Sequence, residues 1–215
     1  MTKLISVAID SPAAAGAGTQ AKLIAKHYNL YYLDTGKIYR FVGFLKIKYK
    51  KKFNYNLVKK KINNLKISQL QKKKLLSNDV ATVASVIAKD KKIRKIVHNF
   101  QKKCAHKPPK NFNGSILDGR DITSVIMRDA MFKFFITANV KTRAKRRYKE
   151  LKSLNIKTSY DEVLKSIKKR DKNDYKRKIS PLKKTRDSTL INTTNLSKRS
   201  CFLKIKQIMD KKLKF

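Results

Sequence analysis

The segment of residues 3–19, KLISVAIDSPAAAGAGT, most constrains what this chain can fold into. Its first half is apolar and predicts a buried β-strand, and the small residues that follow predict a tight loop leading into a helix. The loop resembles the phosphate-binding pattern G-x-x-x-x-G-K-[ST], in which backbone amides surround phosphate oxygens. Gly16 and Thr19 fit this pattern, whereas Ser11 stands for its first glycine and Ala17 for its lysine.

The same segment has a plainer interpretation. Alanine and glycine between a strand and a helix let the helix pack close to the sheet without binding anything. Taken alone, the segment leaves both alternatives open, a phosphate site and a simple connection. Other parts of the chain have to decide between them.

Four further short apolar runs predict buried strands. Together with the first, they cover residues 4–9, 30–33, 115–117, 132–137 and 189–192, and helical patterns separate them. This alternation predicts an α/β fold with a five-stranded parallel sheet flanked by helices. Ligands bind such sheets at the carboxyl ends of the strands, so the site is expected at that edge.

The length of 215 residues predicts a single domain, 1–215. Its core comprises residues 1–35 and 111–215. The intervening stretch of about 36–110 has no strong strand and predicts an insertion, in which the Lys-rich residues 46–76 are helical and lie over the site. Residues 106–114, with two prolines and a glycine, predict a loop.

The chain carries 55 Lys and Arg against 14 Asp and Glu, a formal charge of +41. Such an excess favours polyanionic partners, above all nucleic acid. The lysines are spread along the whole chain, however, which indicates compositional bias and predicts only non-specific, salt-sensitive nucleic-acid binding. No apolar run is long enough to span a membrane, and Cys104 and Cys201 lack metal or redox spacing. We expect a cytoplasmic monomer without a membrane partner.

Polar residues follow the first three predicted strands. The loop described above follows the first, LDTGKIYR (33–40) the second and DGRD (118–121) the third. Because these strand ends meet at one edge of a parallel sheet, their side chains converge. Arginine suits bidentate phosphate binding, although Arg40 or Arg120 taken singly could equally form a surface salt bridge.

Two arginine groups lie on predicted helices. Arg143, Arg146 and Arg147 share one helical face, which suits either a solvated basic surface or a phosphate-clamping lid. Arg170, Asp174 and Arg177 have the spacing i, i+4 and i+7, which also predicts one helical face. An ordinary ion pair explains the first two residues of this second group but not the third.

In this order and spacing, six segments resemble those of the bacterial cytidylate kinases, a family of P-loop nucleoside monophosphate kinases. The segments are DSPAAAGAGT, YLDTGKIYR, DGRDI, TANVKTRAKRR, KKRDKNDYKRKISPL and INTTNLS. The resemblance implies transfer of the γ-phosphoryl group of ATP to CMP or dCMP, giving CDP or dCDP, with Mg²⁺. It also implies that the insertion binds CMP and that residues of about 143–160 form a lid.

Carried over residue by residue, the resemblance implies three groups of site residues. The ATP-binding residues are Asp10, Ser11, Pro12, Ala13, Ala14, Ala15, Gly16, Ala17, Gly18 and Thr19, and Thr19 also meets Mg²⁺. The substrate-binding residues are Thr35, Arg40, Ser85, Arg94, Arg120, Asp121, Arg170, Asp174 and Arg177. The catalytic residues are Arg120, Asp121, Arg143 and Arg147.

The sequence departs from the family pattern at Ala13, where a hydroxyl is common, and at Ala17. Losing one preorganised cation costs on the order of 10²- to 10³-fold in rate, unless Lys22 or a lid arginine compensates. The sequence therefore predicts an active or weakly active kinase. Its rivals are a pseudokinase that still binds CMP, a basic RNA-associated protein and, less well supported, a kinase for another monophosphate.

Overall fold

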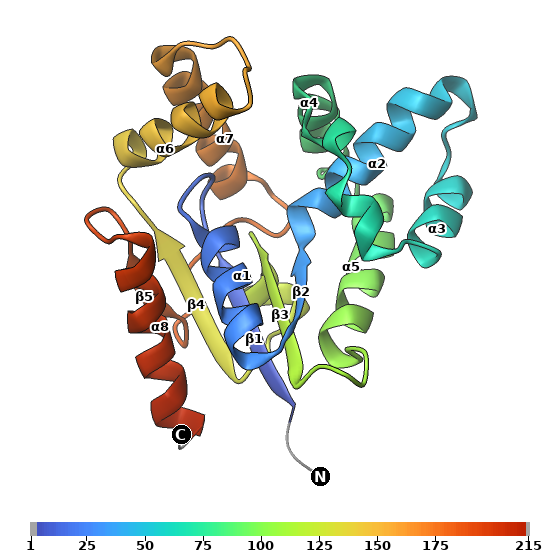
Figure 1. Ribbon diagram of the computed structural model, residues 1–215. Coiled ribbons are helices and arrows are strands. Elements are labelled where there is room, and N and C mark those ends of the chain that lie inside the picture. The colour runs from blue at the N-terminus through green and yellow to red at the C-terminus, as the bar shows by residue number, and fades with distance from the viewer. Residues whose placement is uncertain (1–3, 214–215) are drawn as a thin grey trace.

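The computed structural model describes residues 4–213, with side chains at every position except 78. Five parallel strands form one sheet in the order β2-β3-β1-β4-β5 (Figure 1). The strands are β1 Ile5–Asp10, β2 Tyr31–Asp34, β3 Gly114–Gly119, β4 Phe132–Thr137 and β5 Thr189–Asn192. The predicted five-stranded parallel sheet is confirmed, with strand ends within two residues of those expected.

Eight α-helices lie in the described part of the chain. They are α1 Ala17–Tyr28, α2 Thr35–Tyr49, α3 Tyr55–Asn63, α4 Asn78–Ile87, α5 Lys91–His106, α6 Val140–Ser153, α7 Tyr160–Lys176 and α8 Lys198–Leu213. Short 3₁₀ turns cover Lys50–Lys52, Ile67–Gln71 and Lys73–Leu76, and a π-helical turn covers Ile122–Ile126. None of the helices between residues 4 and 213 is both long and apolar enough to cross a membrane.

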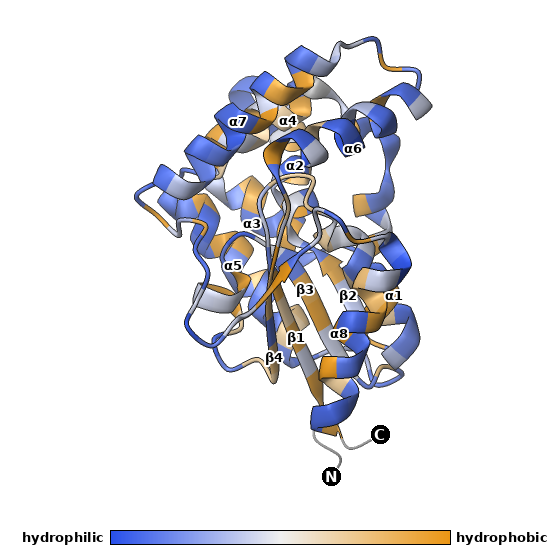
Figure 2. Ribbon diagram, turned by 90° about the vertical axis from the view of Figure 1, so that its left-hand side faces the viewer, coloured by the Kyte–Doolittle hydropathy of each residue, from blue (hydrophilic) through white to orange (hydrophobic). Residues whose placement is uncertain are grey.

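Helices cover both faces of the sheet because side chains alternate along each strand. Val7 and Ile9 of β1 belong to an apolar cluster with α1 and α8, whereas Ala8 belongs to a second cluster with α2, α3 and α5. All three side chains are fully buried. Figure 2 shows apolar strands between helices whose colouring is mostly hydrophilic with apolar patches. The insertion of α2 to α5 therefore packs directly on one face of the sheet.

Helices α6 and α7 form a hairpin beyond the carboxyl edge of the sheet (Figure 1). Ala144 and Leu151 of α6 pack against Val163 and Ile167 of α7 in a small apolar cluster of their own. The side chain of Ser159 caps α7 by accepting from the amide of residue 162. The segment expected to form a lid, about 143–160, comprises most of α6, the connection and the first residue of α7.

Helices α2 and α4 pack closely through Gly43. A Cβ atom added at Gly43 would lie 3.0 Å from the carbonyl oxygen of Val80 and 3.0 Å from the amide nitrogen of Ala84, both in the backbone of α4. A backbone cannot yield as the end of a flexible side chain can. Glycine at this position therefore sets how near the two helices of the insertion lie.

We expect Gly43→Ala to destabilise the fold. Forcing α2 and α4 apart costs about 1–3 kcal/mol, of which alanine's better helix propensity recovers up to about 1 kcal/mol. Urea unfolding followed by circular dichroism measures the difference, with Lys46→Ala on the exposed face of α2 as control. A Gly43→Ala protein as stable as the wild type would contradict the close packing.

Candidate nucleotide-binding site

The loop between β1 and α1 curls around its own amides. The amide of Ser11 donates to the carbonyl of Gly119 at 3.1 Å, which joins the start of the loop to the end of β3. Ala14 (φ 58°) and Gly16 (φ 93°) adopt left-handed conformations, which turn successive amides toward one side. Among the described residues no side chain caps α1, so the first-turn amides are open to a ligand. This geometry is that of an anion-binding nest.

The carbonyls of this loop are held on its outer side. Arg143 Nη1 donates to the carbonyl oxygen of Ala13 at 3.0 Å, and Thr193 Oγ1 donates to that of Ala15 at 3.0 Å. Arg146 in turn donates to the hydroxyl and carbonyl oxygens of Thr193. Since the C=O and N–H of one peptide point in opposite directions, fixing these carbonyls directs the following amides inward. Helix α6 thus helps to shape the loop.

Ala17 begins α1 and is buried, with 4% of its surface exposed. It belongs to the apolar cluster of α1, α8 and the sheet. At this position the chain supplies a methyl group and no charge. Any cation for a phosphate here has to come from another residue.

Asp10 connects β1 to the segment after β3. Its carboxylate is fully buried and accepts from the amides of Ile122 (2.8 Å) and Thr123 (2.9 Å) and from the Thr123 hydroxyl (2.6 Å). Burial raises the pKa of Asp10 to about 6, although these hydrogen bonds oppose the shift. Asp10 therefore anchors the π-helical turn that follows DGRD to the start of the loop.

Two further carboxylates meet at the ends of β2 and β3. Asp34 and Asp118 are register partners, and the hydroxyl of Tyr32 donates to Asp118 Oδ1 at 3.0 Å. Burial and the charge of Asp34 raise the pKa of Asp118. A Cβ added at Gly18 would lie 3.4 Å from Asp118 Oδ2, so this carboxylate faces the first turn of α1. Hard oxygen donors at this place suit a divalent cation.

Arginines from three elements surround the strand ends. Arg120 Nε donates to Asp174 Oδ2 at 2.7 Å, and the same carboxyl group lies 3.9 Å from both Arg170 and Arg177. Burial and the charge of nearby Arg147 lower the pKa of Arg40. One carboxylate serves three arginines, so positive charge is in excess. Such a cluster favours an anionic ligand.

The predicted helical face of Arg170, Asp174 and Arg177 is wrong in one respect. Helix α7 ends at Lys176, and Arg177 is extended, with ψ of 138°. Arg177 still reaches Asp174, because Asp174 also accepts the backbone amide of Leu182 and so holds the chain against the end of the helix. Arg177 Nη2 is buried and has no hydrogen-bond partner among the described residues. This nitrogen is free to meet a ligand.

The three arginines of α6 have separate partners. Arg143 pairs with Asp171 at 2.6 Å, Arg146 binds Thr193, and Arg147 pairs with Glu150 at 2.8 Å. Arg143 is buried in its role of holding the loop, whereas the Arg147 side chain is 30% exposed. The repulsion expected between neighbouring arginines is relieved because each is matched locally.

Asp121 lies deeper, in a buried ion pair. Arg94 Nη2 is 2.5 Å from Asp121 Oδ2, with side chains only 3% and 6% exposed. Thr35 is also buried and donates to the carbonyl oxygen of Asp118 at 2.8 Å.

Ser85 differs from these residues, because it is exposed and its hydroxyl donates to the carbonyl oxygen of Thr82 in its own helix. Thr19 is exposed as well.

Several supporting residues escaped the sequence analysis. Thr123, Asp171 and Thr193 all hold site residues, and each acts through a contact between distant segments. His98 contacts Asp121 and lies one turn after Arg94, a spacing that a search of the helix for polar neighbours could have found. Within residues 4–213 no three His, Cys, Asp or Glu residues cluster as a metal site.

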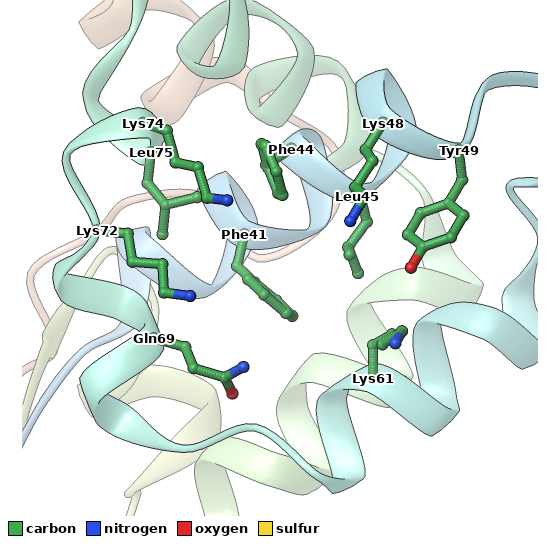
Figure 3. Close-up of a pocket in the computed structure, with 10 residues that line it drawn as sticks. All are labelled: Phe41, Phe44, Leu45, Lys48, Tyr49, Lys61, Gln69, Lys72, Lys74 and Leu75. Carbon is green, nitrogen blue, oxygen red and sulfur yellow. The ribbon is translucent and has the colours of Figure 1, made fainter.

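A separate hollow of about 150 Å³ lies within the insertion (Figure 3). None of its lining residues is a predicted site residue. They are Phe41, Phe44, Leu45, Lys48, Tyr49, Lys61, Gln69, Lys72, Lys74 and Leu75. Lys74 Nζ lies 4.5 Å from the ring centroid of Phe44, and Lys48 and Lys61 lie over Tyr49. The Leu75 carbonyl accepts from Arg40 Nη1 at 3.0 Å, so this wall supports the site.

The parallel sheet, the amide loop and the surrounding arginines are consistent with the P-loop class of nucleotide-binding α/β proteins. Residues 7–211 match the family described as cytidylate kinase. The cytidylate kinase of Bartonella tribocorum is 40% identical over 201 residues, which cover 91% of this chain and 90% of that protein. That of Clostridium botulinum (strain Loch Maree / Type A3) is 36% identical over 222 residues, covering 96% and 95%.

The chain belongs to the cytidylate kinase family. A solved structure of an uncharacterized protein from Eubacterium ventriosum ATCC 27560 has a similar fold, with a TM-score of 0.57 and 18% identity. The match covers 96% of this chain and 98% of that one. At this identity the likeness supports the fold alone.

The raised pKa of Asp10 predicts a pH-dependent stability. The folded state holds this proton up to about pH 6 and the unfolded state only to about pH 4, so the free energy of unfolding falls as pH rises between these values. In Asp10→Asn this contribution is absent. The stability difference between wild type and variant should shrink by about 2–3 kcal/mol from pH 4 to pH 7.

Urea unfolding at several pH values measures this difference, with Asp79→Asn, an exposed carboxyl, as control. If the difference in the free energy of unfolding between wild type and Asp10→Asn is the same at every pH in this range, the raised pKa of Asp10 is contradicted.

Proposed function

We propose that the protein is an ATP-dependent (d)CMP kinase that transfers the γ-phosphoryl group of ATP to CMP or dCMP, giving CDP or dCDP. The observation that supports this best is the convergence, at one edge of the sheet, of an amide nest and three arginines that share a single carboxylate. Phosphoryl transfer needs little covalent help from the protein and depends on positioning and on charge stabilisation. A chain of this family with such a site has both.

In this proposal the two nucleotides bind on different elements. The loop of residues 10–19 holds the ATP phosphates, and Asp10 acts by supporting it. The monophosphate nucleotide is bound by Thr35, Arg40, Ser85, Arg94, Arg120, Asp121, Arg170, Asp174 and Arg177. Arg147 is the α6 arginine best placed to reach the transferred group, since Arg143 is committed to Ala13 and Asp171.

We propose Mg²⁺ as the accompanying ion. It would be held by the nucleotide phosphates with the carboxylates of Asp118 and Asp34 nearby, where burial and the charge of Asp34 raise the pKa of Asp118. The exposed hydroxyl of Thr19 is the further candidate contact predicted from the sequence. The ion would supply charge neutralisation of the phosphates.

The alanine at position 17 gives a second candidate function, a pseudokinase that binds CMP without efficient turnover. Other cations near the site can replace the charge of the missing loop lysine, and this favours an active kinase over a pseudokinase. Lys22 is near enough to Asp118 to lower its pKa, and Arg120 does the same from the end of β3. A basic RNA-associated protein is a further alternative, supported only by the charge of +41. A monomeric state and a cytoplasmic location also stay predictions.

The first test is turnover. A coupled assay of ADP release should show activity with CMP and dCMP that requires Mg²⁺, while UMP serves as the comparison substrate. Absence of turnover above background at millimolar substrate would reject the kinase proposal. Calorimetry then separates the rivals, because a pseudokinase binds CMP, whereas an RNA-associated protein binds RNA with a steep salt dependence and does not bind CMP.

Restoring the lysine should raise the rate. In Ala17→Lys the new ammonium can approach the transferred phosphoryl group, and we expect kcat to rise by about 10- to 10³-fold, depending on how far other cations already compensate. Ala17→Met is the matched control, since it adds a similar chain without charge. Equal kcat in all three proteins would show that the native site already has a full substitute for the lysine.

A further inference from the structure

The Arg94–Asp121 pair has a third member that the family resemblance did not supply. His98 lies one turn after Arg94 on α5, and its Nε2 atom is 3.4 Å from Asp121 Oδ2 and 3.3 Å from Arg94 Nη2. The His98 side chain is 17% exposed, whereas the carboxyl group it reaches is 6% exposed. The imidazole thus extends from the solvent edge to a buried carboxylate.

The contacts of Arg94 and His98 with Asp121 end on the same carboxylate oxygen. Arg94 and His98 both approach Oδ2, and no described side chain bonds Oδ1. His98 Nε2 lies between an acceptor, Asp121 Oδ2, and a donor, Arg94 Nη2, so the tautomer decides which contact is a hydrogen bond, and a protonated Nε2 donates to Oδ2. Two donors on Oδ2 fix the plane of the carboxyl group and leave Oδ1 for a ligand.

The surroundings favour an ionised Asp121. Burial alone would raise the pKa of Asp121, but the hydrogen bond from His98 and the charge of Arg94 hold it below the usual value. The charge of Asp121 raises the pKa of nearby Asp10, and the other groups near this cluster are cationic or neutral. They are Lys91, Lys95 and Lys102 on the same helix, Arg177 after α7, and Tyr39 of α2 beneath Arg94.

We propose that His98 is a positioning residue of the monophosphate site, which holds Asp121 in the orientation that binds the pyrimidine nucleotide. This inference rests on the proposed function. His98 touches neither the phosphate cluster nor the ATP loop in any described contact, and it acts on substrate only through Asp121 and Arg94. Its effect is therefore on the binding of the nucleoside monophosphate, in the ground state and the transition state alike.

The test compares His98→Leu with His98→Gln in the full-length chain. Leucine keeps the bulk of the side chain and removes the donor, whereas the glutamine amide places an N–H close to the position of imidazole Nε2. Asn99→Leu is the matched control, since Asn99 is the exposed neighbour of His98 and forms no side-chain hydrogen bond or ion pair with a site residue in the described structure.

We expect His98→Leu to raise KM for CMP about tenfold, with kcat and KM for ATP within about twofold of wild type. His98→Gln should recover most of the affinity, and Asn99→Leu should match the wild type. The inference is overturned if KM for CMP is unchanged in His98→Leu, or if glutamine rescues nothing. It is also overturned if KM for both substrates, kcat and melting temperature all change together, because that pattern indicates a structural role.

A measurement independent of turnover separates this inference from the proposed function. The chain has three histidines, so His98→Gln assigns the imidazole signals of His98 by nitrogen NMR. The Nε2 shift of His98 should move in Asp121→Asn, because the charged acceptor is lost. If it does not move, the inference fails even in an active kinase. If wild type lacks CMP binding and turnover, the proposed function fails whatever the NMR result.

Discussion

The site depends on the junction between β1 and β3. Pairing of these central strands sets Asp10 opposite Gly119, and from there the amide of Ser11 binds the Gly119 carbonyl while the Asp10 carboxylate binds the backbone after DGRD. One side of the junction leads into the amide loop and the other leads to Arg120 and Asp121. Any shift in this register would separate the two elements proposed to bind nucleotides, since both start within two residues of it.

The region around this junction contains buried carboxylates, and apolar packing does not explain their presence. Asp10 is fully buried with a raised pKa, and Asp118 lies beside Asp34 with the same direction of shift. Buried carboxylates of this kind lower the stability of the empty protein. Carboxylates with shifted pKa values are common at functional sites, and the edge of a parallel sheet is where ligands bind.

Charge is unevenly balanced across the molecule. The lysines are spread over the surface, and some of them rest on aromatic rings of the insertion, as around Phe44 and Tyr49. The arginines behave differently. Most of those at the strand ends are fixed by carboxylates or carbonyls, and their guanidinium groups converge on one region. The overall charge therefore does not indicate a function, whereas the convergence of the arginines indicates where an anionic ligand binds.

The sequence predicted those features that depend on local pattern. Apolar runs of three to six residues defined the strands, and the βα alternation gave the parallel sheet and the edge where ligands bind such sheets. It placed Arg40, Arg120 and Asp174 in one site, because each belongs to a motif near a strand end or a helix end. It was wrong about the helical conformation of Arg177, since α7 ends at Lys176 and the chain turns back to place the Leu182 amide on the Asp174 carbonyl, a contact that no local pattern shows.

What the sequence by itself determined is the class of fold, the family and the identity of the loop with its alanine at position 17. Only the tertiary structure decided what that loop rests on. Arg143 holds Ala13, Thr193 holds Ala15, and His98 and Arg94 meet on one oxygen of Asp121. Most of these contacts join residues many positions apart, and a side chain's partner across such a distance follows from packing rather than from spacing along the chain.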